Sequence, residues 1–177
     1  MKTPLRILFI CTHNRCRSII AEALANHVSE DCLLAASAGS DPASEVHPFT
    51  LQSLRRHGIA TTGLRSKSWD ELRNFAPHFV ITVCDDAADE PCPLWLNKAR
   101  SLHWGIADPS LLAVDEATSH RDFDQTIAIL TARLLWLREG VRQGLNLQGI
   151  EQLIRSLADT SERTGKQEAQ WACSSAF

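Results

Sequence analysis

The feature that most constrains how this chain folds is an apolar run followed directly by a short polar loop and the start of a helix. Residues 7–10 are apolar, residues 11–18 are mostly polar, and from Ile19 onward apolar side chains return at the spacing of a helix. Strand, loop and helix therefore follow one another without a gap, as at the opening of a parallel α/β fold. In such sheets ligands bind at the carboxyl ends of the strands, where helix N-termini converge. Cys11, the first residue of the loop, is predicted to lie at that edge.

The loop carries the residue types that hold a tetrahedral oxyanion beside a nucleophile. A cysteine attacks as the thiolate, and a thiol with an ordinary pKa of about 8.5 is mostly protonated at neutral pH unless a helix N-terminus or a cation lowers that pKa. Backbone N–H groups that curl around an anion form a nest, and the planar guanidinium of Arg17 can bind two oxygen atoms at once. Ser18 can hydrogen-bond the sulfur of Cys11, and Asn14 tolerates the left-handed backbone of a tight loop.

A lone cysteine at a strand end is more often a buried structural residue followed by a basic helix cap. Here cysteine, asparagine, arginine and serine all stand between strand and helix, and this combination favours an oxyanion site. The pattern Cys11-Thr12-x-Asn14-x-x-Arg17-Ser18 resembles the phosphate-binding loop of the low-molecular-weight tyrosine phosphatase superfamily, which includes arsenate reductases of the same fold. The resemblance implies a single-domain, three-layer α/β sandwich with a four-stranded parallel sheet and helices on both faces. It also implies that the oxyanion is bound by the run Thr12, His13, Asn14, Arg15, Cys16, Arg17 and Ser18.

Composition and charge are those of an ordinary globular domain. The chain has 177 residues, of which 44% are hydrophobic, and a formal net charge of −3 at pH 7. These values predict one domain with a substantial core, residues 1–145, followed by a C-terminal helix and a loosely ordered polar tail, residues 146–177. The near-neutral charge gives no indication of the basic surface that binds nucleic acid or a membrane. Without a signal peptide or an apolar stretch that could span a bilayer, the chain is expected to be cytoplasmic, and we expect a monomer.

The six cysteines of the chain point to thiol chemistry. They argue against a secreted disulfide scaffold, and they do not form the paired Cys-x-x-Cys half-sites of structural zinc. Cys84 directly follows residues 79–83, which are predicted to form a strand by their density of β-branched side chains. It repeats the position of Cys11, so both thiols are expected at the same edge of the sheet. Cys92 follows eight positions later, in an acidic segment whose prolines and small residues allow it to rearrange.

An Asp-Pro pair, Asp108-Pro109, follows another short predicted strand at residues 101–104. At the same edge of the sheet, the carboxyl group of Asp108 can lie next to a bound oxyanion and act as a general acid. An Asp-Pro pair alone more often starts a turn. Together with the Cys11 loop it resembles the superfamily pattern, in which the catalytic acid comes from such a pair, and Asp108 becomes the candidate acid.

The remaining elements are predicted from hydrophobic periodicity and turn residues. The first helix is expected to end near residues 29–31, and a long helix to begin at Ser119. Gly140 and Gly144 are expected to break that helix near its end. The other predicted elements are a strand at 33–38, a helix from 48 to 58, a short helical piece around 69–72 and an amphipathic helix at 147–157.

Cys84 and Cys92 help to decide whether the chain resembles the phosphatases or the arsenate reductases of the superfamily. The segment Cys84-Asp85-x-Ala87 with Cys92-Pro93 resembles the redox segment of the thioredoxin-coupled arsenate reductases. This resemblance implies a relay in which Cys11 attacks arsenate, Cys84 attacks Cys11, and Cys92 attacks Cys84. No cofactor would be tightly bound and no metal is expected; an external thiol donor, either thioredoxin or glutathione with glutaredoxin, would reduce the final disulfide. The implied catalytic residues are Cys11, Arg17, Cys84, Cys92 and Asp108.

The chain has no tyrosine, and Ser110 follows the Asp-Pro pair where many phosphatases of the family have one, which favours the reductase branch. Two departures and two alternatives accompany this interpretation. The tail after about residue 145 is additional to the compact family domain. The thioredoxin-coupled reductases tend to have one residue fewer between the redox cysteines, which leaves the donor open. The alternatives are phosphomonoester hydrolysis by Cys11, Arg17 and Asp108, and non-catalytic oxyanion or redox sensing. Cys16 is interpreted as a filling residue behind the loop, with oxidation to a disulfide with Cys11 as the alternative, while Cys32 is interpreted as a core residue and Cys173 as a tail thiol.

Overall fold

A parallel sheet of four strands forms the centre of the molecule. The computed structural model describes residues 3–89, 93–110 and 116–158. The strands are β1 (Leu5–Ile10), β2 (Leu33–Ala38), β3 (Phe79–Thr82) and β4 (Arg100–His103), in the order β2-β1-β3-β4. All neighbouring strands run parallel, so the predicted four-stranded parallel sheet is confirmed.

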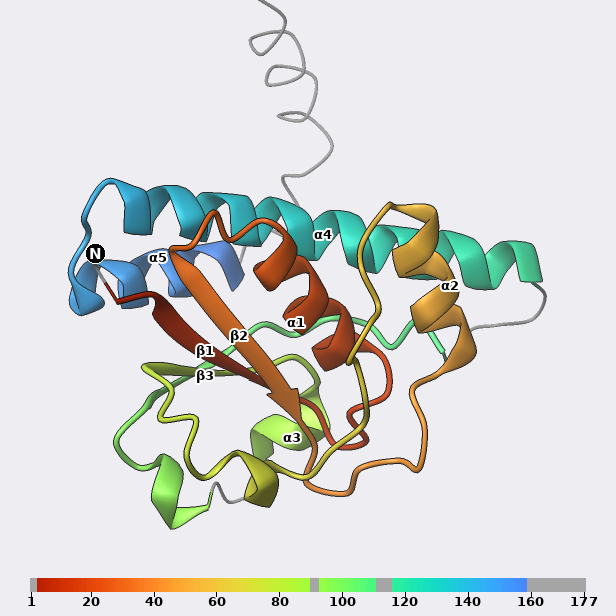
Figure 1. Cartoon of the computed structure of the whole chain (residues 1–177), viewed down its shortest axis with the longest axis horizontal. Coiled ribbons are helices and arrows are strands. Elements are labelled where there is room, and N and C mark those ends of the chain that lie inside the picture. Colours follow the sequence, from red (N-terminus) through yellow and green to blue (C-terminus); the bar gives the residue numbers. More distant parts are fainter. Residues whose placement is uncertain (1–2, 90–92, 111–115, 159–177) are drawn as a thin grey trace, which may run out of the picture.

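Helices on both faces of this sheet give the predicted three layers. Figure 1 shows α1 (Arg17–His27), α2 (Pro48–Arg56), α4 (Glu116–Arg142) and α5 (Leu147–Ala158) on one side and α3 (Asp85–Asp89) on the other. Two 3-10 helices, η1 (Trp69–Leu72) and η2 (Leu94–Leu96), lie in the connections to β3 and β4. Within the described ranges, no helix is both long and apolar enough to cross a membrane.

The strands are covered on both faces, which explains why β1 reads as an unbroken apolar run. In β1 and β3 every residue except Arg6 is buried, as expected for parallel strands between helical layers. Ile10 pairs with Ala38 of β2 and with Thr82 of β3, so these three strands end at the same level. Their carboxyl ends form the edge where the sequence predicts the site.

Two helix boundaries differ from the predicted ones. α1 ends at His27, before the predicted residues 29–31, and the left-handed Glu30 and Asp31 (φ 41° and 64°) turn the chain toward β2. α4 begins at Glu116 and not at Ser119. Both differences concern helix ends, where a local pattern carries the least information.

The predicted break at Gly140 is wrong, because α4 continues through it to Arg142. A Cβ atom at position 140 would lie 2.6 Å from Leu153 Cδ2 and 3.5 Å from Ile150 Cδ1, both in α5. The glycine is therefore a close-packing position between two helices. Gly144 lies just beyond the end of α4 and has a left-handed backbone conformation, with a φ of 81°.

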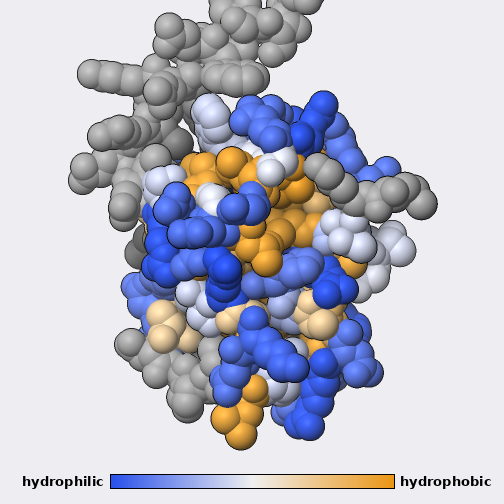
Figure 2. All heavy atoms as spheres, turned by 90° about the vertical axis from the view of Figure 1, so that its left-hand side faces the viewer, coloured by the Kyte–Doolittle hydropathy of each residue, from blue (hydrophilic) through white to orange (hydrophobic). Residues whose placement is uncertain are grey.

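The α4–α5 turn lies on the left side of Figure 1, near the amino end of β1. Figure 2, which faces that side, shows a hydrophobic area framed by hydrophilic residues. Leu145 and Leu147 are exposed large hydrophobic residues of this turn. The carboxyl edge of the sheet lies at the opposite end of β1, so this area is separate from the predicted site.

Candidate active site

The loop from Cys11 to Ser18 joins β1 to α1, and several of its carbonyl groups point outward. In a trans peptide the C=O group and the following N–H group point in opposite directions. The N–H groups of residues 13, 14 and 16 therefore face the inside of the loop, as an anion nest requires. The outward hydrogen bonds are Thr12 O from Asp41 N (3.0 Å), His13 O from Ala43 N (2.9 Å) and Arg15 O from His47 N (3.0 Å).

The sulfur of Cys11 is buried against the start of α1. It lies 2.9 Å from the hydroxyl oxygen of Ser18, in the first turn of that helix. Burial raises the pKa of the Cys11 thiol, and this outweighs the Ser18 hydroxyl and the backbone N–H groups of Ser18 and Asn14, which lower it. The thiol is therefore protonated at neutral pH when no oxyanion is bound. The hydrogen bonds to the sulfur stabilise the thiolate and so limit the rise of the pKa.

Ser18→Ala is expected to make Cys11 less reactive at neutral pH. Loss of the hydroxyl raises the pKa of the Cys11 thiol further, so less thiolate is present at any given pH. We expect alkylation of Cys11 by iodoacetamide at pH 7 to slow by roughly fivefold, and its rate to level off at a higher pH than in the wild type. Peptide mass spectrometry over a pH series measures this rate. An unchanged profile would show that Ser18 does not stabilise the thiolate.

A chain of buried and half-buried polar side chains holds the loop in place. Asn14, whose φ is 43°, donates through Nδ2 to the hydroxyl oxygens of Ser18 (2.8 Å) and Ser37 (2.9 Å). The Ser37 hydroxyl donates to Glu22 Oε2 (2.5 Å), and Lys67 Nζ binds the same carboxylate oxygen at 3.0 Å. The Lys67 backbone N–H donates to Asn14 Oδ1 (2.8 Å), so the chain of hydrogen bonds returns to Asn14. Because the Ser18 oxygen accepts from Asn14, its own proton is available to the loop thiol.

Gly39, directly after β2, allows the loop to approach the sheet. A Cβ atom at position 39 would lie 2.4 Å from Thr12 O and 3.1 Å from Asn14 N. Both neighbours are backbone atoms, so no side-chain movement could relieve the contact. Glycine is therefore required here by the close approach of two backbone segments.

Arg17 and Asp108 form an ion pair beside the loop. Arg17 donates through Nη2 to Asp108 Oδ2 (2.8 Å) and through Nη1 to Ile106 O (2.9 Å). The other carboxylate oxygen of Asp108 accepts from the Ser110 backbone N–H (2.9 Å) and hydroxyl (2.7 Å). Burial raises the pKa of Asp108, but the two Ser110 hydrogen bonds and then Arg17 and Arg15 together hold it below its usual range. Asp108 is therefore ionised at neutral pH in this arrangement.

Cys84 brings a second thiol to the loop. It follows β3, is only 2% exposed, and its Sγ lies 3.8 Å from Thr12 Oγ1. Val83 N donates to Ile10 O, so the pairing of β1 with β3 continues to the residue before Cys84. A negative charge on Cys84 raises the pKa of Cys11, because the two sulfur atoms lie within electrostatic reach of each other. The structure thus brings together the two thiols that the sequence predicts at one edge.

The other predicted loop residues occupy different surroundings. His13 is exposed, and its Nδ1 lies 3.1 Å from Asp41 O. Arg15 is half-buried. Cys16 is buried, and burial raises the pKa of its thiol despite a hydrogen bond with the Thr50 side chain.

Cys32 lies away from this site. The Cys32 backbone carbonyl accepts from Leu5 N at the amino end of β1, the opposite end from the loop. Cys92 and Cys173 lie outside the described residues. In the part of the chain that the structure describes, no group of three or more His, Cys, Asp or Glu side chains is arranged to hold a metal ion.

The supporting residues Glu22, Ser37, Gly39 and Lys67 were not identified from the sequence. The Ser37–Glu22 contact joins residues 15 positions apart, and the Lys67–Asn14 contact joins residues 53 positions apart. No local spacing marks such pairs. The available signal was weak: Ser37 and Gly39 stand at the end of a predicted strand, at the edge where the loop was expected.

Most of the chain is similar to one family of known proteins. Residues 6–146, most of the chain, match the family model described as low molecular weight phosphotyrosine protein phosphatase. The chain belongs to this family. The match includes the complete Cys11 loop, Cys84 and Asp108, and it ends before α5.

Proteins with a similar sequence or the same fold include both arsenate reductases and a phosphatase. An arsenate reductase of Shouchella clausii is 37% identical over 106 residues, which cover 59% of this chain and 73% of the relative. A thioredoxin-dependent arsenate reductase of Corynebacterium glutamicum has a solved structure with a TM-score of 0.61 and 28% identity, covering 82% of this chain and 66% of that chain. The YwlE arginine phosphatase from Geobacillus stearothermophilus has the same fold at 22% identity, with a TM-score of 0.61, over 81% of this chain and 99% of that chain. The fold alone therefore does not decide between these activities.

Proposed function

We propose that this chain is an arsenate reductase, with Cys11, Cys84 and Cys92 as a thiol relay. The observation that carries the proposal is the second thiol beside the loop: Cys84 is buried, with its Sγ 3.8 Å from Thr12 Oγ1. Hydrolysis of a phosphate ester has no use for a thiol at this place, whereas reduction of arsenic needs one to form a disulfide. The similarity to proteins named arsenate reductase supports the same choice.

Arsenate binding would exchange the partners of Arg17. At rest its guanidinium is bound to Asp108 and Ile106 O. An oxyanion surrounded by the inward N–H groups of the loop competes for these donors through charge-assisted hydrogen bonds. When Arg17 turns to the oxyanion, Asp108 loses a cationic neighbour and gains an anionic one, so its pKa rises. Asp108 can then hold a proton, as a general acid must.

The proton that Asp108 needs is already present at rest. Burial keeps the pKa of Cys11 above its ordinary value, so the thiol holds a proton, while Ser110 and Arg17 keep the pKa of Asp108 low and its carboxyl group ionised. Transfer of this proton from the thiol to Asp108, through an oxygen atom of the bound arsenate, produces the nucleophile and the acid together. The site would thus become reactive only when the oxyanion is bound.

The first chemical step joins sulfur to arsenic. The Cys11 thiolate forms a bond to arsenic(V), an arsenic–oxygen bond breaks, and the oxygen leaves as water after accepting the proton of Asp108. Cys84 then attacks Cys11 Sγ as a thiolate. A sulfur–sulfur bond forms, the sulfur–arsenic bond breaks, and its electron pair stays on arsenic, which leaves as arsenite.

The last steps return the site to its reduced state. Cys92 attacks Cys84 and releases the Cys11 thiolate, leaving a Cys84–Cys92 disulfide. An external thiol donor supplies the two electrons and two protons that reduce this disulfide. Since Cys92 lies outside the described residues, its part rests on the sequence resemblance of the segment that begins at Cys84.

The test is an arsenate-dependent turnover assay in which two donor systems are supplied separately. Thioredoxin with its reductase is one system, and glutathione with glutaredoxin and its reductase is the other. We expect one of them to support NADPH oxidation matched by an equal amount of arsenite, with no oxidation when phosphate replaces arsenate. Hydrolysis of para-nitrophenyl phosphate without arsenite formation would identify a phosphatase. Absence of both activities would favour the oxyanion or redox sensor.

A further inference from the structure

α5 lies beyond the residues that match the family, yet it is built into the core. The family match ends at residue 146, and α5 begins at Leu147. Its residues Ile150, Ile154 and Leu157 are buried, and Gly140 allows it to pack closely against α4. α5 also packs against β4, the strand that leads to Asp108. An element outside the common family domain therefore supports the segment that carries the candidate acid.

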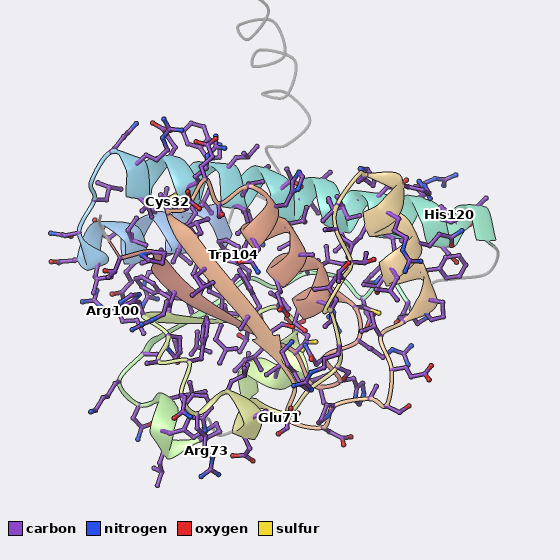
Figure 3. All side chains as sticks on the ribbon, in the orientation of Figure 1. Cys32, Glu71, Arg73, Arg100, Trp104 and His120 are labelled. Atoms are coloured by element: carbon purple, nitrogen blue, oxygen red, sulfur yellow. The ribbon has the colours of Figure 1, made fainter. Side chains whose placement is uncertain are left out.

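Trp104, the residue after β4, contacts this helix directly. Its side chain is fully buried, and its Nε1–H donates to Ile154 O in α5 at 2.9 Å. Its ring centre lies 6.3 Å from that of Phe9 in β1. Figure 3 labels Trp104 near the centre of the molecule. One indole therefore connects the middle of the sheet to α5.

Arg133 of α4 fixes the far end of α5 to the same indole. Its guanidinium carbon lies 5.4 Å from the centre of the Trp104 ring, and Nη2 donates to Ala158 O, the last residue of α5, at 3.2 Å. A cation is favoured both over the face of an indole and beside the carbonyl end of a helix. α5 is thus held to Trp104 at two points, through Ile154 and through its C-terminal end.

Trp104 is also the anchor from which the acid loop departs. Its backbone N–H donates to Thr82 O (2.8 Å), which continues the pairing of β3 with β4. Two residues later Ile106 O accepts from Arg17, and two residues after that Asp108 binds the same guanidinium. The position of both acceptors therefore depends on where Trp104 is held.

We propose that α5 is part of the catalytic unit and that, through Trp104, it holds Ile106 O and Asp108 in position against Arg17. Trp104 is a positioning residue, because its side chain binds Ile154 O and packs against Arg133 while its effect on the acid passes through the chain that follows it. The kinetic part of the proposal rests on the proposed function, in which Asp108 is the acid. The structural part, that α5 restrains residues 104–110, can be tested without any activity.

The test is Trp104→Phe in the full chain, which keeps an aromatic ring and removes the N–H that binds α5. We expect faster hydrogen exchange in peptides covering residues 104–110. We also expect kcat for arsenite formation to fall by about tenfold and KM to change by less than about threefold, because the acid is misplaced while the loop still binds the oxyanion. In the Asp108→Asn background the same substitution should change kcat by less than about twofold, because two changes that act through one group are not additive.

Glu151→Gln is the matched control, since Glu151 is also on α5 and also binds β4. Its Oε2 accepts from Arg100 Nη1 at 2.6 Å, at the other end of the strand from Trp104, and Figure 3 labels Arg100 on the left side of the molecule. This variant should leave kcat and the exchange of residues 104–110 within about twofold of the wild type. Unchanged exchange in Trp104→Phe, or additive effects with Asp108→Asn, would overturn the proposal. A wild type that forms no arsenite would contradict the proposed function, and hydrogen exchange would still decide whether α5 braces the loop.

Discussion

Cys84→Ser is expected to abolish arsenite formation and to leave phosphate ester hydrolysis in place. A serine hydroxyl cannot form a disulfide with Cys11, so the sulfur–arsenic adduct has no route to arsenite. We expect multiple-turnover arsenite formation to fall by at least about a thousandfold, and hydrolysis of para-nitrophenyl phosphate to change by less than about threefold. Binding of the oxyanion should persist, because Arg17, Ser18 and the loop N–H groups do not depend on the second thiol.

The pH dependence of the remaining hydrolysis gives this variant a second readout. A charged Cys84 raises the pKa of Cys11, so removing it lowers that pKa. Hydrolysis by Cys84→Ser should therefore reach its plateau at a slightly lower pH than hydrolysis by the wild type. An unchanged plateau would mean that the two sulfur atoms do not interact electrostatically, and a shift to higher pH would contradict the assigned direction.

Two further variants control the Cys84→Ser experiment. Cys11→Ser should lose both activities, because it removes the nucleophile. Cys32→Ser should lose neither, because Cys32 lies at the amino end of β1, away from the loop. Arsenite and para-nitrophenol should be measured on the same preparations. Full arsenate turnover by Cys84→Ser would contradict the relay.

The loop itself could be predicted from the sequence because its determinants are local. The apolar run of β1 reflects burial on both faces of a parallel sheet. Asn14 has the left-handed backbone expected from its residue type, and Ser18 lies against the Cys11 sulfur. These features depend on residues within seven positions of one another, where residue type and spacing largely decide the structure.

The polar support of the loop could not be predicted, because it joins segments far apart in the chain. Lys67 and Glu22 form a largely buried ion pair whose members are 45 positions apart, and neither belongs to a motif. Burial of such charges is acceptable only when both are paired and hydrogen-bonded, a condition that the folded chain alone can reveal. The same holds for Trp104, which the sequence indicated only as the end of a strand, and whose partner Ile154 is 50 positions away.

The resting state of the acid is another property that residue type did not indicate. The sequence predicts Asp108 as a proton donor, whereas the structure shows it in an ion pair with Arg17, 91 positions away, and with its pKa held low. A motif can indicate which residue supplies the carboxyl group. Its protonation state follows from neighbours that the motif does not contain. This makes Arg17 the residue whose substitution changes both the resting and the reacting site.

Arg17→Lys is expected to lower kcat/KM for arsenate by about two to three orders of magnitude. The Arg17 guanidinium donates to Ile106 O (2.9 Å) and Asp108 Oδ2 (2.8 Å) together, and in the proposed reaction it binds two oxygen atoms of the substrate. A lysine ammonium is a single point of charge, so it holds the oxyanion less well and leaves the half-buried Ile106 contact incomplete. Arsenite formation over a range of arsenate concentrations measures the loss.

The matched control is Arg65→Lys, which changes an exposed arginine paired with Glu71 and should stay within about twofold of the wild type. Near-normal activity of Arg17→Lys would mean that the oxyanion is held by the loop N–H groups alone.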